Sequence, residues 1–257
     1  MNSKVKIIED LSLNAWPSHQ IELYDGWILR FSYFYTHRTN SVEQIGPSAL
    51  PLHEKIAYCE SVYRNWGTPC IFKINPLVPR DFDTLLYKKE YAIEHLTEVM
   101  TMHIPEHLPG PVESPVILEN AISPAWIFSL FDLKGTTDPV HRQIVPSMYR
   151  SIPKITIAAH IEENGRFAAT GLGILDRNYI GVYAIHVDPA CRRKHYARDI
   201  CRSILAEGMR QGADQAYLQV VQGNTAARRL YESLGFEQFY TYWFRVSPPC
   251  AAAGPSR

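Results

Sequence analysis

The sequence predicts an α/β protein with a mixed sheet and two similar halves. Three observations support this fold class. Patterns typical of strands and of amphipathic helices alternate along the 257 residues, and a proline-rich segment divides the chain. Both parts show the same succession of strands, helix, strand, helix and long strand, which indicates an internal duplication. The other interpretation of this rhythm is that any mixed α/β chain produces it.

The first half contains one strong hairpin signal and two long helical patterns, after a short helical pattern around Ile7, Ile8 and Leu11. Asp25-Gly26 stands between two apolar runs, as in two-residue hairpin turns. A glycine ends the first long helical pattern and a proline opens the second. We expect a hairpin at residues 19–32, strands at 36–45, 69–75 and 91–104, and helices at 50–67 and 79–90.

The segment PEHLPGPVESP, from Pro105 to Pro115, holds four prolines and one glycine. This composition is typical of a linker. We therefore expect a first domain at residues 1–104, a linker at 105–120, a second domain at 121–246 and a tail at 247–257.

The second half repeats these signals. Asn164-Gly165 predicts a hairpin turn, and an apolar stripe that includes Ile200, Ile204 and Leu205 predicts an amphipathic helix. We expect a hairpin at residues 154–175, strands at 180–189, 216–221 and 236–246, and helices at 123–133, 138–152, 191–212 and 225–235.

Composition limits the class of protein. The chain has 26 Lys+Arg and 26 Asp+Glu, and this zero balance argues against a nucleic-acid binder. Its five cysteines include no CxxC pair, so we expect neither a disulfide framework nor a structural zinc site. Free thiols, no membrane-spanning apolar run and no signal-peptide pattern at the start lead us to expect a cytoplasmic protein with no membrane partner.

The stretch VDPACRRKHYARDI, residues 187–200, joins a predicted strand to a predicted helix. The start of a helix presents unpaired N–H groups and a positive dipole end, which together bind anions. Arg192, Arg193, Lys194 and Arg198 add positive charge where a diphosphate would lie. For the charge run alone, a solvated basic surface is the alternative interpretation.

At this point the chain resembles the GNAT superfamily of N-acetyltransferases. That family has Val-x-Pro followed by Arg/Gln-x-x-Gly-x-Gly/Ala, and here Val187-Asp188-Pro189 precedes residues 192–197. The family's second signature, Asn-x-x-Ala-x-x-Leu-Tyr-x-x-x-Gly-Phe, is complete. Its residues here are Asn224, Ala227, Leu230, Tyr231, Gly235 and Phe236. The resemblance covers residues 151–246 well and the first half in outline, and it implies a tandem GNAT-like acyltransferase fold.

The resemblance implies acetyl-CoA as co-substrate and no metal. The pantetheine arm would pair with backbone groups of residues 183–187, where this strand splays from residues 216–221. A backbone N–H near Ile185 to Val187 would polarise the thioester carbonyl. The implied cofactor-binding residues are Ile185, His186, Val187, Arg192, Arg193, Lys194, His195, Tyr196, Ala197, Arg198, Asn224, Ala227 and Tyr231.

The resemblance also implies catalytic roles. Tyr231 would protonate the departing thiolate as general acid, and a packing tyrosine is the alternative. Many relatives carry a glutamate base on the strand before Val-x-Pro, but residues 181–187 contain none. His186 is the candidate base, with a structural histidine and a water relay as alternatives. Asn224 would contact pantetheine or cap its helix.

His195 departs from the family pattern, which usually has glycine there. Glycine keeps a side chain away from the diphosphate. We expect His195 to adopt helical dihedrals, to keep its backbone N–H available and to point its side chain outwards, so that the site still works.

The predicted function is transfer of an acetyl group from acetyl-CoA to a primary amine of a small molecule or peptide. Amine-bearing antibiotics are one acceptor class, because some tandem GNAT-like proteins acetylate them as self-resistance. Asp132, Asp138, Glu162 and Glu163 are acidic positions that could receive a cationic acceptor. The alternatives are a non-catalytic CoA-binding or regulatory module and a protein lysine or N-terminal acetyltransferase.

The first half lacks both signatures, and Leu86 stands near the place of the catalytic tyrosine. It therefore resembles a degenerate GNAT half, and we expect acetyl-CoA to bind only in the second half.

Overall fold

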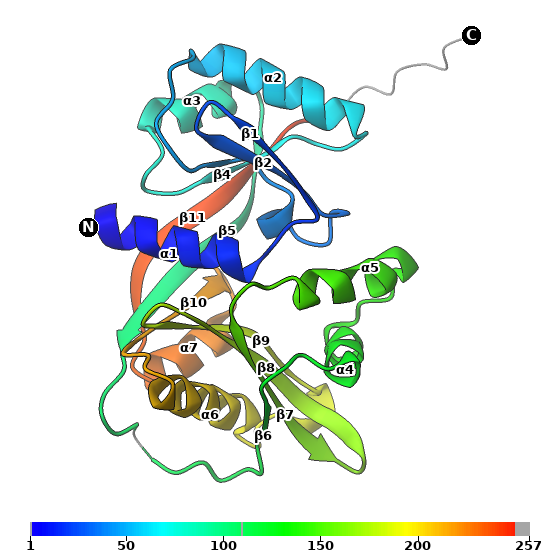
Figure 1. The fold of residues 1–257 in the computed structure, drawn as a ribbon, viewed down its shortest axis with the longest axis vertical. Helices are drawn as coiled ribbons and strands as arrows, with labels where there is room; N and C mark the ends of the chain where they lie inside the picture. Colours follow the sequence, from blue (N-terminus) through cyan, green and yellow to red (C-terminus); the bar gives the residue numbers. More distant parts are fainter. Residues whose placement is uncertain (1, 109, 250–257) are drawn as a thin grey trace. The chain divides into compact units, whose positions relative to one another are not determined.

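The structure is a computed structural model that describes residues 2–108 and 110–249 (Figure 1). Contacts between residues divide the chain into two compact units. The first contains Ser18–Thr97 and short segments from both chain ends, and the second contains Lys6–Pro17 and Glu98–Tyr240. Two long strands, β5 (Ala92–His103) and β11 (Glu237–Val246), contribute residues to both units. The proline-rich segment therefore lies within the second unit.

The second unit is a mixed α/β arrangement. Its strands lie in the order β11, β5, β10, β9, β8, β7 and β6. The strands that lie wholly in this unit are β6 (Ile117–Glu119), β7 (Ile155–Glu163), β8 (Arg166–Asp176), β9 (Tyr179–Val187) and β10 (Gln215–Val221). The helices are α4 (Pro124–Lys134), α5 (Pro139–Arg150), α6 (Tyr196–Arg210) and α7 (Thr225–Ser233). Short β6 lies inside the predicted linker and was not expected as a strand.

Local capping explains where these helices begin. The Ser123 hydroxyl accepts a hydrogen bond from Trp126 N–H at 3.2 Å, and the Asp138 carboxylate accepts one from Val140 N–H at 2.8 Å. Such caps satisfy N–H groups that have no intrahelical partner. The predicted helices at residues 123–133 and 138–152 are thus confirmed.

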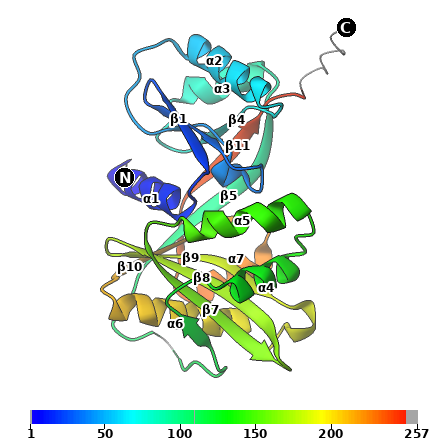
Figure 2. The same ribbon diagram turned by 45° about the vertical axis from the view of Figure 1, so that its right-hand side comes forward.

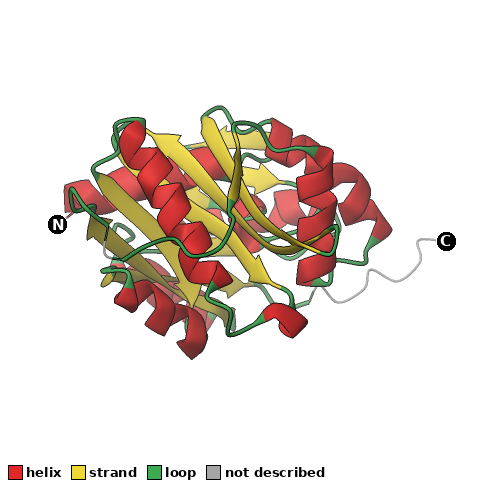
Figure 3. Ribbon diagram, turned by 90° about the horizontal axis from the view of Figure 1, so that it is seen from below, coloured by secondary structure: helices red, strands yellow, loops and turns green. Residues whose placement is uncertain are grey.

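Helix α6 lies close to β8 because β8 carries glycines beneath it. Figures 1 and 2 show α6 on one side of β7, β8 and β9, with α4 and α5 on the other. A Cβ atom at Gly171 would lie 2.3 Å from Ile200 Cγ2, and one at Gly173 would lie 2.6 Å from Ile204 Cγ2. Both isoleucines are fully buried. The two glycines therefore determine how closely the helix approaches the sheet. Figure 3 shows the helices in red and the strands in yellow from another direction.

The first unit contains a three-stranded sheet of β1 (Gln20–Tyr24), β2 (Trp27–Phe31) and β3 (Glu43–Gln44). It also contains α2 (Leu52–Asn65), α3 (Arg80–Lys88) and β4 (Ile71–Ile74), which pairs with β11. Helix α1 spans Asn2–Ala15, which is longer than the short pattern expected, and most of it belongs to the second unit. The hairpin predicted at residues 19–32 is confirmed. No helix among the described residues is long and apolar enough to cross a bilayer.

The strand predicted at residues 36–45 is mostly wrong. A 3-10 helix, η1 (His37–Thr39), occupies its start, and only two residues form β3. Buried Asn40 explains the difference. Its side chain accepts from Ser32 N–H at 2.5 Å and donates to Thr36 O at 2.6 Å. These side-chain bonds replace the strand ladder that the alternating pattern suggested.

The two units end their last helices in the same way. Tyr91 N–H donates to Leu86 O at 3.1 Å after α3, and Phe236 N–H donates to Tyr231 O at 3.0 Å after α7. The residue before each donor is left-handed: Glu90 has φ 63° and Gly235 has φ 97°. Leu86 therefore occupies the position in the first unit that Tyr231 occupies in the second. This match favours the duplication over a rhythm shared by chance.

Replacing Gly171 by alanine should lower the free energy of unfolding by about 1–3 kcal/mol, because the added methyl group overpacks the contact with α6. Gly46→Ala is the control, since the nearest atom to its added Cβ lies 3.9 Å away. Urea unfolding of both variants checks this. Equal free energies of unfolding for the two variants would contradict the close approach of α6.

Candidate functional site

Two parallel strands of the second unit stop pairing halfway along their length. β9 and β10 pair over Tyr179–Val182 and Gln215–Leu218, and their pairing ends there. Both strands continue, β9 to Val187 and β10 to Val221. Backbone groups that face each other beyond this point have no strand partner, so an extended ligand can pair with them. The splay predicted from the sequence therefore has a structural counterpart that begins after Leu218.

A β-bulge turns β9 at the same place. The register between β8 and β9 shifts so that Ala184 and Ile185 stand opposite the single residue Gly171. Ala184 has φ 51°, and its carbonyl accepts a hydrogen bond from Thr170 Oγ1 at 3.3 Å. Bulges bend a strand and increase its twist. The bulge thus explains why β9 leaves β10.

Beyond its bulge, β9 has a backbone N–H, that of Val187, on the edge that faces away from β8. Asp188 N–H donates to Ala168 O of β8 at 2.8 Å. Consecutive N–H groups of a strand point to opposite edges, so the N–H of Val187 points toward β10. Of the three residues predicted near the thioester carbonyl, Val187 thus offers an outward donor and the N–H of His186 faces β8, while Ile185 lies in the bulge, where the alternation is interrupted.

The loop after β9 contains two left-handed residues. A short 3-10 turn, η2 (Pro189–Cys191), is capped by Asp188. Arg193 and His195 then have φ values of 68° and 63°, and α6 begins only at Tyr196. The helix start predicted at residue 191 is wrong, because left-handed residues interrupt a right-handed helix.

His195 is the N-cap of α6, with φ 63° and ψ 8°. The expectation of helical dihedrals is therefore wrong. Glycine adopts this conformation without the steric penalty of a Cβ atom, which gives a backbone reason for the family's preference. Histidine is one of the residues that tolerate it best. The His195 side chain is exposed and makes no capping hydrogen bond.

The start of α6 presents N–H groups for an anion. The first helical bond runs from Asp199 N–H to His195 O at 3.0 Å. The N–H groups of Tyr196, Ala197 and Arg198 consequently have no intrahelical acceptor. They lie at the positive end of the helix dipole, where a phosphate binds favourably.

The four cations of this region form two groups. Arg192 and Arg193 are exposed, and the structure gives them no ion-pair partner among the described residues. Lys194 Nζ lies 2.8 Å from Glu163 Oε1, and Arg198 lies 3.3 Å from Glu113 Oε2. Of these four side chains, the first two arginines therefore offer unpaired charge to a ligand. The other two are already paired with carboxylates.

Glu163, at the end of β7, holds the loop from one side. Its carboxylate accepts hydrogen bonds from Lys194 Nζ at 2.8 Å, from Cys191 Sγ at 3.3 Å and from the Tyr196 hydroxyl. The bonds from Lys194, Tyr196 and Cys191 lower the pKa of Glu163 to about 2. One carboxylate therefore joins three side chains that flank both left-handed residues. We call this arrangement the Glu163 clamp.

Tyr231 lies on α7 and is 8% exposed. It belongs to the same buried cluster as Cys201 of α6. The structure gives the Tyr231 hydroxyl no hydrogen-bond partner among the described residues. Burial, with a smaller effect of Cys201, raises the pKa of Tyr231. The phenol is therefore protonated near neutral pH, as a general acid must be.

Asn224 caps α7, because its side chain accepts from Ala227 N–H at 3.2 Å. The capping role considered from the sequence is thus present. Asn224 also lines a pocket of about 350 Å³ with buried Glu98. One Glu98 oxygen lies 3.2 Å from Arg228 and the other has no hydrogen-bond partner among the described residues.

His186 stands opposite Thr170 of β8 and is half-buried. Burial, followed by the charge of Lys134, lowers the pKa of His186. A lowered pKa keeps the imidazole neutral near pH 7, the form that can accept a proton. This is compatible with the predicted base role and also with a structural histidine.

The four acids expected to receive a cationic acceptor all have partners. Asp132 pairs with Arg142 at 3.0 Å, and Asp138 caps α5. Glu162 lies 3.5 Å from His160, and Glu163 forms the clamp. Glu163 is thus engaged in several bonds, whereas Asp132, Asp138 and Glu162 each have a contact within the protein but remain exposed.

A strand edge that opens toward a helix start with free N–H groups, together with a buried tyrosine in the same hydrophobic cluster, is the arrangement expected of an acetyltransferase of the GNAT type. The chain belongs to the family described as "Probable histone acetyltransferase Rv0428c C-terminal", whose family model matches residues 2–244.

Individual proteins agree with this assignment. The "Uncharacterized N-acetyltransferase YobR" of Bacillus subtilis is 24% identical over 247 residues, which cover 94% of this chain and 98% of the relative. A GCN5-related N-acetyltransferase from Kribbella flavida has the same fold, with a TM-score of 0.68, 16% identity and 95% of each chain covered. A tandem GNAT protein from the clavulanic acid biosynthesis pathway has a TM-score of 0.64 at 10% identity, over 94% of this chain and 88% of that one.

Sequence reasoning missed the Glu163 clamp. From the sequence, Glu163 stood out only as a charge for the acceptor, because its partners follow about thirty positions later in the chain. The hydrogen bond between Glu163 and Lys194, for example, spans 31 positions. The hairpin turn at Asn164-Gly165 was a usable signal, since it places the end of β7 near the end of β9 through β8.

His195→Gly should leave the free energy of unfolding unchanged or raise it by about 1 kcal/mol. Glycine removes a left-handed penalty of about 1–2 kcal/mol but adds about 0.5–1 kcal/mol of unfolded-state entropy. His195→Val should be destabilising, because a β-branched residue is poorly tolerated at positive φ. Urea unfolding compares the three proteins. A strongly destabilised glycine variant would contradict the left-handed assignment.

Glu163→Gln should raise the KM for acetyl-CoA without changing kcat, because the clamp orients the loop and does not touch the reacting atoms. The pKa of Glu163 is lowered to about 2, so the charged clamp is complete above its ordinary pKa and is lost only as pH falls toward 2. Hence Glu163 itself should add no pH dependence between about pH 6 and 8. Steady-state kinetics with Glu162→Gln as the adjacent control check this. An unchanged KM for acetyl-CoA would mean that Glu163 does not orient the loop for binding.

Proposed function

We propose that the second unit transfers an acetyl group from acetyl-CoA to a primary amine. The observation that carries this proposal is the continuity of the β9 edge with the start of α6. Unpaired backbone groups beyond Val182 suit the amides of pantetheine, and the free N–H groups at Tyr196 to Arg198 suit the diphosphate. The exposed side chains of Arg192 and Arg193 would add charge beside it.

The reaction needs a donor for the oxyanion, an acid for the thiolate and an acceptor for the amine proton. The neutral amine attacks the thioester carbonyl carbon, a C–N bond forms, and the carbonyl oxygen becomes negative. The N–H of Val187 would stabilise that oxygen. The C–S bond then breaks, Tyr231 gives its proton to the thiolate, and solvent restores it. The amine loses one proton, either to His186 or through water to solvent.

The proposed acceptor is an amine, and the contacts of the four acids help to compare the possible classes of amine. Glu163 is engaged in the clamp and Asp132 pairs with Arg142. Among the described residues, Asp138 and Glu162 are therefore the two of the four acids without a permanently charged partner for a polycationic antibiotic to replace. The family's description as a probable histone acetyltransferase favours a lysine side chain of a protein as a second acceptor class. A cytoplasmic location would suit either acceptor.

Tyr231→Phe should lower kcat by about a hundred- to ten-thousand-fold while the acetyl-CoA dissociation constant changes little. The variant keeps the buried ring and removes only the proton. Tyr179→Phe is the control, because it removes another buried phenol at the paired end of β9. Stopped-time assays of CoA release at saturating substrates measure both. Unchanged turnover in the Tyr231 variant would mean that Tyr231 contributes only to packing.

A panel of amines tests the proposed activity. Small primary amines, lysine-containing peptides and an aminoglycoside should be offered with acetyl-CoA, with CoA release and product mass as readouts. At least one amine should give an acetylated product. Acetyl-CoA binding without a product from any amine would instead support a non-catalytic CoA-binding module.

A further inference from the structure

Three metal-ligand side chains meet in the first unit, whereas the residues discussed for acetyl transfer belong to the second. They are His37, Glu94 and His95, and each offers one ligand atom. These atoms all lie within 4.8 Å of one another. We call this group the His-Glu-His cluster. It joins η1 to β5, since His37 and Glu94 are 57 positions apart in the chain.

The backbone of β5 is distorted so that the cluster can form. Consecutive side chains of a regular strand point to opposite faces, so Glu94 and His95 should diverge. His95 instead has φ 49°, and its carbonyl accepts a hydrogen bond from Thr97 Oγ1 at 2.7 Å. A left-handed histidine within a strand is a strained feature, and strained residues gather at binding sites. Here the strain turns two adjacent donors toward His37.

The orientation of His37 is fixed by its surroundings. Its Nε2 lies 2.9 Å from Glu94 Oε2, and its ring lies nearly perpendicular to that of His95, with centroids 4.6 Å apart. The other neighbour is Phe244 of β11, whose ring centroid is 5.3 Å away. Because His37 is held and His95 is exposed, the latter side chain can move to complete a coordination sphere.

The donor set favours a transition metal over a hard cation. Imidazole nitrogens suit zinc and its neighbours, whereas calcium and magnesium prefer oxygen ligands. Zinc bonds of about 2.0–2.2 Å to three protein groups leave a fourth position for water or another ligand. Two neutral imidazoles and one carboxylate together carry a single negative charge. Arg38 is the nearby cation, and its Nε donates to the Tyr242 hydroxyl at 3.0 Å.

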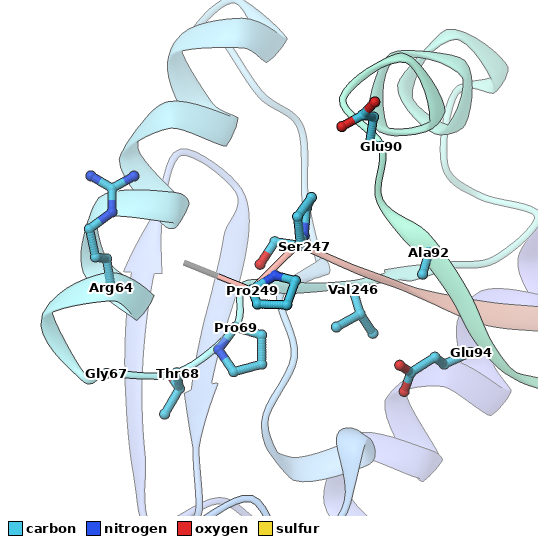
Figure 4. A pocket seen from close by; sticks show the side chains of 11 residues that line it. Arg64, Gly67, Thr68, Pro69, Glu90, Ala92, Glu94, Val246, Ser247 and Pro249 are labelled. Atoms are coloured by element: carbon cyan, nitrogen blue, oxygen red, sulfur yellow. The ribbon is translucent and has the colours of Figure 1, made fainter. Parts of the chain in front are cut away.

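An open pocket borders the cluster on the side of Glu94. Glu94 lines a pocket of about 720 Å³, together with Arg64, Glu90 and the residues that follow β11. Figure 4 shows the Glu94 carboxylate among the side chains around this pocket. A metal held by Glu94 would therefore lie at the border of a space that can admit a further ligand.

We propose that His37, Glu94 and His95 bind one divalent transition-metal ion of the zinc type in the first unit. The site is independent of acetyl transfer, because none of its ligands belongs to the second unit. The alternative role of the cluster is a hydrogen bond between His37 and Glu94 with no metal.

Isothermal titration of chelator-treated protein with Zn²⁺ tests the proposal. We expect one equivalent of Zn²⁺ per chain, and weaker binding by at least about tenfold in both Glu94→Gln and His95→Gln. Both substituted side chains are exposed, so the fold should survive, and circular dichroism checks it. Mg²⁺ should give no comparable binding in the unchanged protein.

Two controls separate the cluster from adventitious zinc binding. Glu90→Gln changes another acid of the same pocket, and His53→Gln removes a histidine whose side chain is 76% exposed. Neither should alter Zn²⁺ affinity. The proposal is overturned if the unchanged protein binds no Zn²⁺, or if the cluster variants bind it as tightly as the two controls do.

Discussion

The candidate site depends on the point at which β9 and β10 stop pairing. Two parallel strands that remained paired to their ends would leave no backbone group for a ligand, because nearly all buried N–H and C=O groups find partners. Here the bulge at Ala184 redirects β9 after Val182. The polar groups beyond it are then free for an extended, amide-bearing molecule. The glycines of β8 allow α6 to pack close to the sheet. The positive end of the α6 dipole then follows the open edge of β9.

The loop between β9 and α6 has the backbone conformation that an anion site would need, with a histidine in place of a glycine at its N-cap. The site needs a left-handed residue at the N-cap and backbone N–H groups after it, and neither requirement depends on a particular side chain. His195 meets the first requirement at an energetic cost. The Glu163 clamp offsets that cost by tying Cys191, Lys194 and Tyr196 to β7. The charges of the loop thus serve two purposes: some hold the loop, and Arg192 and Arg193 remain for a ligand.

Much of the fold could be predicted because the signals were local. The hairpin turns at Asp25-Gly26 and Asn164-Gly165, and the helices after Ser123 and Asp138, follow from short motifs. The two signatures also identified the strand, the loop and the tyrosine of the candidate site. Side-chain hydrogen bonds account for the failures. Asn40 replaced a predicted strand through bonds to Ser32 and Thr36, and a carboxylate on another strand binds residues that flank the left-handed positions of the loop before α6. Periodicity carries no information about such bonds.

Backbone N–H groups at the start of α6 are proposed to bind the diphosphate of acetyl-CoA. Calorimetric titration with acetyl-CoA and with acetylpantetheine, which lacks the diphosphate and the phosphorylated adenosine attached to it, tests this binding. We expect one acetyl-CoA site per chain and binding of acetylpantetheine at least about a hundredfold weaker, which corresponds to about 2.7 kcal/mol. Equal affinities for the two compounds would mean that the diphosphate makes no stabilising contact with the start of α6.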